Sequence, residues 1–149
     1  MKPSEACIEF IKGFEGFRPT AYRCSAGVLT IGYGTTEFVE IGDTVTEEEA
    51  CDLLRKDVQE AADAIDGLVD VELSQSQYDA LTSWIYNCGR SAFQNSTLLK
   101  LLNSGHSPES VAAQLLRWDK SNGVVVSGLT RRRKAEYDMF LSPSGPKKR

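Results

Sequence analysis

Apolar residues recur at helical spacing in several segments of the chain, and most of these segments have recognisable end signals. The first segment runs from Ser4 or Pro3 to Phe14. The second opens with a capping box between Thr46 and Glu49, which predicts a helix to about residue 65. Further helices are predicted over residues 78–88, 97–103, 107–118 and 129–141.

Between the first two helices the pattern changes to β-branched and aromatic residues that are interrupted by glycines. Residues 17–24 and 27–33 predict two short strands, with a turn at Ser25, Ala26 and Gly27. Asn122-Gly123 predicts another turn near the C-terminal end. This order of elements favours an α+β protein with a small helix-plus-hairpin lobe, a larger mostly helical lobe and a cleft between them.

A chain of 149 residues can bury one core, or two small lobes that share a helix. We expect a single domain with one lobe over about residues 15–66 and a second over about residues 67–141 that also takes in the helix at 3–14. Residues 142–149 are expected to form a flexible tail. The sequence has no apolar run long enough to span a membrane, and Glu5 and Glu9 interrupt any export signal. We therefore expect a cytoplasmic protein without stable membrane association.

The net charge of −4 conceals a basic C-terminal third, which suggests a polyanionic partner such as nucleic acid or bacterial cell wall. The overall acidity, and the lack of aromatic residues within Arg131–Lys134, argue against nucleic acid. Cys7, Cys51 and Cys88 fall on apolar helix faces, and no cysteine pair has the spacing of a zinc or redox site. The single histidine lies in a predicted turn, so we expect neither a metal nor a cofactor.

The segment GFEGFRPTAYRCSAGVLTIGYGTT carries the strongest functional signal. Glu15 stands where the first helix gives way to the hairpin, and Cys24 and Thr30 follow on the two predicted strands. A carboxyl group, a thiol and a hydroxyl would thus meet at one helix-to-sheet junction. A hydrolase needs a group that protonates the leaving group on one side of a bond and others that hold water on the opposite side.

This spacing, followed by Ile31-Gly32-Tyr33-Gly34, resembles the bacteriophage lysozymes (endolysins) of glycoside hydrolase family 24, and the resemblance extends from about residue 7 to residue 141. It implies the lysozyme-like fold and hydrolysis of the β-1,4 bond between N-acetylmuramic acid and N-acetylglucosamine in peptidoglycan. It also implies a monomer that waits in the host cytoplasm until a separate membrane-permeabilising protein, a holin, releases it to lyse the host.

The resemblance implies roles for particular residues. Glu15 would be the general acid, and Thr30 with Cys24 would hold the attacking water, so that the product is inverted. Cys24 stands where the family usually has aspartate, and it is read as a polar group beside the water, as a nucleophile or as a bystander. The resemblance also implies substrate contacts at four positions: Thr36, Tyr86, Ser96 and Arg131.

Arg131 is also the residue that we expect to pair with the acid, while Arg132 and Lys134 are expected to face solvent. Thr35 stands where many relatives have histidine. The leading hypothesis is therefore a muramidase, and the alternative is a catalytically weak or inactive wall-binding module. A thiol enzyme would need a histidine partner for Cys24, and the only candidate is distant in the sequence.

Overall fold

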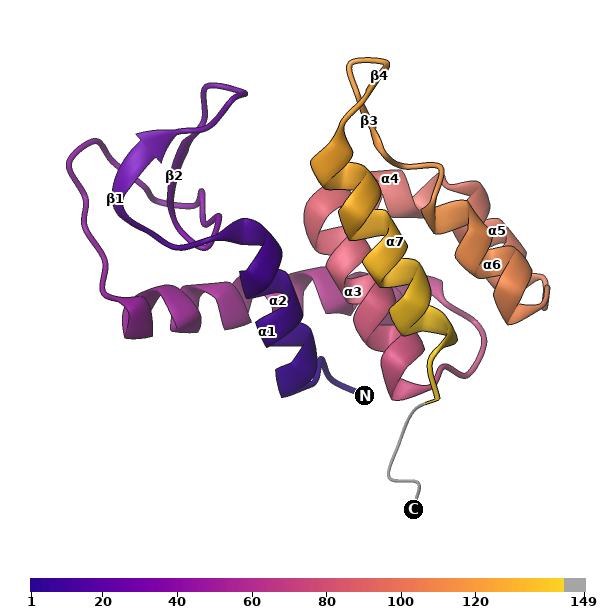
Figure 1. Ribbon diagram of the computed structural model, residues 1–149. Coiled ribbons are helices and arrows are strands. Elements are labelled where there is room, and N and C mark those ends of the chain that lie inside the picture. Colours follow the sequence, from indigo (N-terminus) through magenta and orange to yellow (C-terminus); the bar gives the residue numbers. More distant parts are fainter. Residues whose placement is uncertain (144–149) are drawn as a thin grey trace.

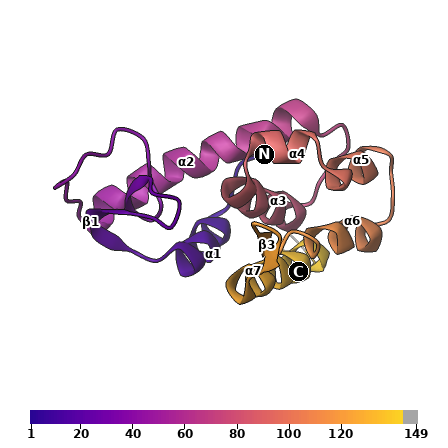
Figure 2. The same cartoon turned by 90° about the horizontal axis from the view of Figure 1, so that it is seen from above.

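One long helix, α2 (Glu47–Leu68), connects a β-hairpin lobe with a mostly helical lobe in the computed structural model, which describes residues 1–143. Figure 2 shows α2 running from the hairpin to the helices of the other lobe. Its first turn is fixed by the predicted capping box, since Thr46 accepts from the Glu49 backbone and Glu49 accepts from the Thr46 backbone. The predicted α+β architecture, with a hairpin lobe and a mostly helical lobe, is confirmed.

The hairpin lobe follows α1 (Glu5–Glu15) and consists of β1 (Arg18–Arg23) and β2 (Leu29–Gly32). The strands are antiparallel, with Tyr22 opposite Thr30 and Arg23 opposite Leu29. Gly27 closes the predicted turn with φ +81° and donates its N–H to the Cys24 carbonyl at 2.8 Å. The turn brings Cys24 beside the start of β2.

The helical lobe contains the remaining elements: α3 (Gln75–Cys88), α4 (Arg90–Gln94), α5 (Thr97–Asn103), α6 (Pro108–Leu115), β3 (Lys120–Ser121), β4 (Val124–Val125) and α7 (Ser127–Leu141). Helix α3 packs between α2 and α7 (Figure 1). Its fully buried Trp84 contacts Trp118 edge-on at 4.9 Å between ring centroids. This packing surrounds α3 with apolar side chains from both neighbouring helices.

Four elements differ from the sequence prediction: one helix ends earlier, and one helix and two short strands were not expected. Helix α6 ends at Leu115 rather than near Trp118, because the N–H groups of Arg117 and Trp118 bond three residues back, to Gln114 and Leu115, in a tight turn. Helix α4 and the short strands β3 and β4 were not predicted, although the turn between these strands at Asn122 and Gly123 was.

Helix α1 joins the two lobes. Its buried Cys7, Ile8 and Ile11 share a core with Leu54 and Val58 of α2. The same helix is anchored to α3, because Ser4 donates its backbone N–H to Asp79 at 3.1 Å and its hydroxyl to the same carboxylate. The lobe boundaries stay a prediction, and most of the expected tail, residues 144–149, lies outside the described residues. No helix in residues 1–143 is both long and apolar enough to cross a membrane.

Candidate active site

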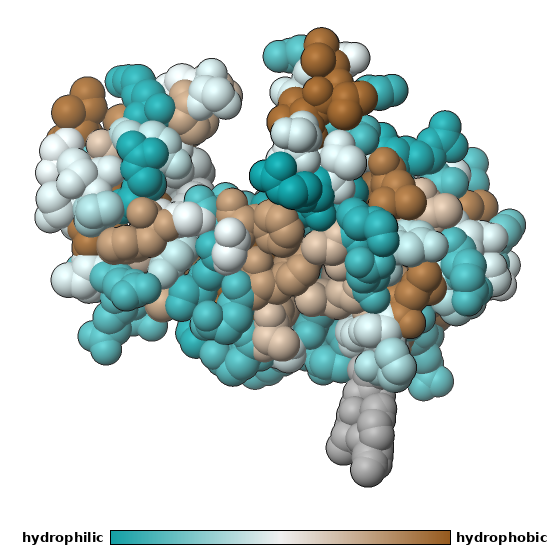
Figure 3. Space-filling view, in the orientation of Figure 1, coloured by the Kyte–Doolittle hydropathy of each residue, from teal (hydrophilic) through white to brown (hydrophobic). Residues whose placement is uncertain are grey.

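A cleft of about 600 Å³ lies between the lobes, where the C-terminal end of α1 faces α2 and α3. The space-filling view in Figure 3 is hollowed between the hairpin side and the helical side of the molecule. The cleft is lined mainly by polar and acidic residues: Glu15, Gly34, Thr36, Glu37, Asp57, Glu60, Ala61, Ile85, Tyr86, Asn87 and Arg90. Three predicted site residues, Glu15, Thr36 and Tyr86, are therefore brought to one cavity.

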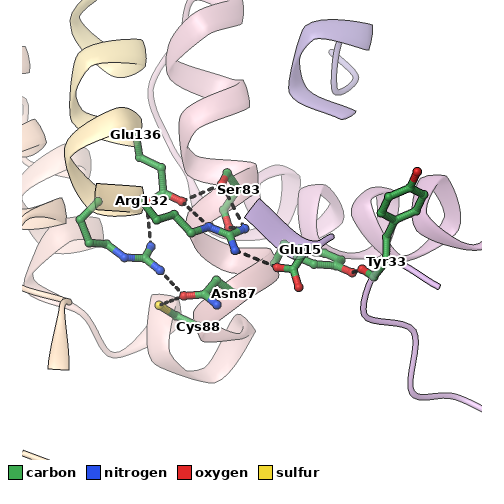
Figure 4. A network of polar contacts seen from close by, with 9 residues as sticks. Glu15, Tyr33, Ser83, Asn87, Cys88, Arg132 and Glu136 are labelled. Atoms are coloured by element: carbon green, nitrogen blue, oxygen red, sulfur yellow. Dashed lines mark hydrogen bonds and ion pairs between the residues drawn. The ribbon is translucent and has the colours of Figure 1, made fainter. Parts of the chain in front are cut away.

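Glu15 is the last residue of α1, and Gly16 ends the helix there with φ +73°. The Glu15 side chain is about one-fifth exposed, and its Oε2 accepts from Arg132 Nη1 at 2.7 Å. Figure 4 shows this contact reaching from α7 across α3 to the end of α1. The carboxylate is thus open to the cleft and held by a buried guanidinium group.

The pairing arginine corrects one prediction. Arg131 was expected to pair with the acid and Arg132 to face solvent, but Arg132 makes the contact while Arg131 is exposed. Residues 132 and 136 are one helical turn apart, so they share the face of α7 that packs on α3. Residue 131 is rotated by about 100° from that face and turns away from Glu15.

The backbone of Gly34 lies close to the Glu15 carboxylate, in a space that a side chain would fill. A Cβ at this position would lie 3.0 Å from Glu15 Oε1 and 3.2 Å from Tyr86 Oη, and the residue has φ +99°. Tyr86 Oη donates to the Tyr33 carbonyl at 2.9 Å, which fixes the ring beside the acid. Burial raises the pKa of Tyr86, so the phenol stays neutral across the usual working range.

Cys24 and Thr30 lie together on the hairpin and are not among the residues that line the cleft. Thr30 is buried and donates its hydroxyl to the Val28 carbonyl at 2.9 Å, which leaves its lone pairs as acceptors. Hydrogen bonds from the backbone of Val28 and Ala26 lower the pKa of the Cys24 thiol, and desolvation acts in the opposite direction. The structure therefore pairs these two predicted residues with each other.

Ser96 is the remaining predicted contact, and the structure does not bring it into the cleft lining. It is buried at the N-terminus of α5, where its hydroxyl accepts from the Leu99 N–H at 3.0 Å and donates to the Phe93 carbonyl at 2.7 Å. Both bonds are made within the protein. The side chain is a helix cap.

Asp57 is a cleft residue that the sequence analysis missed. It lies on α2, and its Oδ2 accepts from Thr35 Oγ1 at 3.1 Å. Burial is the main cause that raises the pKa of Asp57, and the Thr35 hydrogen bond acts in the opposite direction. Thr35, where many relatives were expected to have histidine, therefore has a carboxylate partner. The unusual residue was the only sequence signal that could have led to this pair.

The basic run at Arg131–Lys134 is largely internal. Arg132 and Arg133 are both buried and bind Glu136, at 3.3 Å and 2.6 Å respectively. Lys134 is exposed and pairs with Asp138 at 3.1 Å. Because two of these cations are neutralised inside the fold, the run does not form the open basic surface that nucleic acid binding uses.

Comparison with known proteins gives matches over nearly the whole chain. The family model for phage lysozyme matches residues 12–136. The endolysin of Salmonella phage P22 is 43% identical over 147 residues, covering 95% of this chain and 99% of that protein. The endolysin of Bacillus phage B103 is 44% identical over 145 residues, covering 95% of this chain but 55% of that protein, so the chain spans about half of that relative.

A solved structure agrees with these sequence matches. The muramidase domain of SpmX from Asticaccaulis excentricus superposes with a TM-score of 0.89 at 39% identity, covering 95% of this chain and 99% of that one. A carboxylic acid in a polar cleft between a hairpin lobe and a helical lobe fits the lysozyme-type glycoside hydrolases to which these matches belong. The chain belongs to the phage lysozyme family. The predicted family, and with it the lysozyme-type function of an endolysin, is confirmed.

Proposed function

We propose that this chain hydrolyses peptidoglycan by a single displacement in which Glu15 is the general acid. The observation that carries the proposal is the carboxylate of Glu15 at the wall of a cleft of about 600 Å³, held by Arg132 at 2.7 Å. The bond cleaved would be the β-1,4 bond between N-acetylmuramic acid and N-acetylglucosamine. Protonation of its bridging oxygen by Glu15 turns a poor leaving group into a neutral hydroxyl.

The attacking water is assigned to the hairpin side of the cleft. Thr30 gives its own proton to the Val28 carbonyl, so its oxygen can only accept from a water, which aims a water lone pair away from Thr30. Cys24, beside it, replaces the aspartate that is usual in the family as the second polar group. Attack from the face opposite the acid inverts the anomeric carbon, and this geometry needs roughly 6.5–9.5 Å between the two sides.

Thr36 and Tyr86 are proposed to contact the glycan. Thr36 is exposed on the cleft wall, and Tyr86 lies beside the acid with its proton committed to the Tyr33 carbonyl. The phenol oxygen can then accept a hydrogen bond from a sugar hydroxyl or amide. Arg131, which is exposed on α7, stays a proposed contact only for wall carboxylates outside the cleft.

Release of reducing ends from purified peptidoglycan tests the proposal. The protein should release them, and Glu15→Gln should lower the rate by at least about 100-fold while keeping the thermal unfolding midpoint. Equal rates in both proteins would refute the role of Glu15. Binding to the wall without release by the parent protein would support the wall-binding module instead. The configuration of the first product, read by proton NMR, separates inversion from a thiol-linked intermediate, which would retain it.

We also propose that the protein acts as a monomer on the cell wall, after waiting in the host cytoplasm for a separate membrane-permeabilising protein. This localisation and the holin partner follow from the family resemblance alone. Fractionation of expressing cells, with and without a co-expressed permeabilising protein, tests it. Recovery in the membrane fraction, or lysis without any such partner, would contradict it.

A further inference from the structure

We infer that Glu136 is a positioning residue. Its buried negative charge offsets the positive charge of Arg132, so that Arg132 can orient Glu15 while Glu15 keeps the proton needed for catalysis. This inference depends on the proposed role of Glu15 as the general acid. Glu136 touches neither the cleft nor Glu15, so it would act only through Arg132.

The guanidinium group of Arg132 is held on every side. Its Nη1 donates to Glu15 at 2.7 Å, its Nε donates to Glu136 at 3.3 Å, and its Nη2 donates to the backbone carbonyl and the hydroxyl of Ser83, both at 3.3 Å. Figure 4 shows Glu136 and Ser83 on one side of this group and Glu15 on the other. Because the guanidinium is planar, fixing Nε and Nη2 also fixes the direction of Nη1. Glu136 and Ser83 therefore fix the orientation of the Glu15 carboxylate through Arg132, although neither contacts Glu15 directly.

The Glu136 carboxylate contacts both arginines and is more deeply buried than the Glu15 carboxylate. It is fully buried, and its two oxygens accept from Arg133 Nη1 at 2.6 Å, from the Ser83 hydroxyl at 2.6 Å and from Arg132 Nε at 3.3 Å. Burial raises the pKa of Glu136, and Arg133, Ser83 and Arg132 act in the opposite direction. With two guanidinium groups in contact, the site fits the carboxylate, since every neighbouring group is a donor.

The charges explain why a second carboxylate is needed. A general acid must hold a proton at working pH, and a nearby cation favours its loss. Arg132 and Arg133 are two buried cations that both contact Glu136, while Glu15 and Glu136 are two acids. When Glu136 is ionised, its negative charge offsets one of the two positive charges. Without Glu136, the full charge of both arginines would stabilise the ionised form of Glu15 and favour loss of its proton.

Other titratable groups near this network do not supply that balance. Burial raises the pKa of Cys7 on α1, and of Tyr86 and Cys88 on α3, so all three are neutral in the working range. Asp79 on α3 is engaged by Ser4 and Gln75 at the far end of α1. Asp57 on α2 contributes to the surroundings of Tyr86 and is bound by Thr35. Glu136 is thus the carboxylate in direct contact with both arginines among the described residues.

The test is the pH–activity profile of the full-length protein on purified peptidoglycan. Glu136→Gln should move the alkaline limb of kcat to lower pH by about one unit. The value of kcat on that limb should fall about tenfold, recover at lower pH, and leave KM within about twofold because the side chain is remote from substrate. Glu136→Asp, which keeps the charge, should restore most of the limb.

Two further variants separate charge from packing. Arg133→Gln removes one cation and should move the alkaline limb in the opposite direction. Glu136→Gln combined with Arg133→Gln restores the balance and should return the limb close to its original position. Asp138→Asn makes the same charge change as Glu136→Gln at an exposed position of α7 and should leave the limb in place.

A folded Glu136→Gln variant with an unshifted limb, or a double variant that shifts as far as the single one, would overturn the inference. If Glu136→Gln does not fold, the inference stands or falls on the direction of the Arg133→Gln shift. Glu15→Gln distinguishes this failure from failure of the proposed function. If that variant is inactive while the Glu136 limb does not move, only the positioning role of Glu136 is lost.

Discussion

Arg132 Nη1 lies 2.7 Å from Glu15 Oε2, and this contact joins residues that are 117 positions apart in the sequence. The Arg132 side chain is 5% exposed and the Glu15 side chain 21% exposed. The pair therefore has a buried cation and a cleft-facing anion. It connects the C-terminal helix α7 to the end of α1 at the point where the chemistry is proposed to occur.

We expect Arg132→Lys to lose activity although it keeps the charge. A lysine cannot bind Glu15, Glu136 and Ser83 together, and a displacement of about 1 Å at a reacting group can cost about 100-fold in rate. Arg132→Gln should also lower the free energy of unfolding by about 1–3 kcal/mol, because Glu15 and Glu136 each lose a charged hydrogen-bond partner while Glu136 keeps Arg133. Thermal unfolding and turnover per folded molecule check both changes. Lys134→Gln, at an exposed ion pair, should stay within about 0.5 kcal/mol.

Gly34→Ala should inactivate the protein by displacing the acid. The added methyl group would meet Glu15 Oε1 at 3.0 Å and Tyr86 Oη at 3.2 Å. Gly42→Ala is the matched control, because Gly42 has a similar φ of +92° and open space around its Cβ position. Both variants should lose about 1–2 kcal/mol of stability from backbone strain, but only Gly34→Ala should lose turnover per folded molecule. Equal activities would show that the close approach at Gly34 is not needed.

Cys24→Asp should keep most of the activity, and Cys24→Ala should lose part of it. Aspartate restores the usual acceptor beside Thr30, while alanine leaves Thr30 as the only group that holds the water. Reducing-end release measures both, with Cys51→Ala as a control on a helix of the same lobe. If the alanine variant turns over at the parent rate, Cys24 has no catalytic role. If the aspartate variant is inactive while alanine is active, the water-positioning interpretation fails.

Helix ends were predictable because their signals are local. Thr46 and Glu49 form a capping box within four residues, and it appears in the structure as the sequence indicated. A second box, between Ser74 and Gln77, is equally local. Helix α4 was missed because it is five residues long and begins directly after Gly89 at φ +99°. A helix that short has no hydrophobic period of its own.

The partner of the acid was not predictable from hydropathy. The face of α7 that packs inward contains Arg132, Arg133 and Glu136 together with Phe140. A hydrophobic pattern treats the first three as surface residues, so the inward direction of α7 could not be assigned from the sequence. Glu15, Thr36 and Tyr86 could be assigned to the cleft because the family motif identifies them directly. The buried ion network becomes visible only when α7 is packed against α3.

Alkylation should separate the cysteines by their surroundings. Hydrogen bonds from Val28 and Ala26 lower the pKa of Cys24, whereas burial raises the pKa of Cys7 and of Cys88. Because the thiolate is the reactive form, Cys24 should react with iodoacetamide faster than either of them at neutral pH. Mass spectrometry of the labelled peptides over time measures the order. Labelling of Cys7 before Cys24 in folded protein would contradict the structure.

The contribution of Asp57 to the stability of the fold should decrease as the pH rises. Burial raises its pKa above the ordinary value in the folded state, so the folded protein binds the proton more tightly than the unfolded chain. Its stabilising contribution is then complete at pH values below the unfolded pKa, and it is lost as the pH rises through the folded pKa.

Asp57→Asn should remove this loss, because the amide stays neutral and its oxygen can still accept from Thr35. The melting temperature of the variant relative to the parent should therefore be higher at pH 7 than at pH 3. Asp138→Asn, which removes an exposed carboxylate of α7, is the control and should show no such difference. A relative melting temperature of Asp57→Asn that falls between pH 3 and pH 7 would mean that the folded protein stabilises the ionised carboxylate.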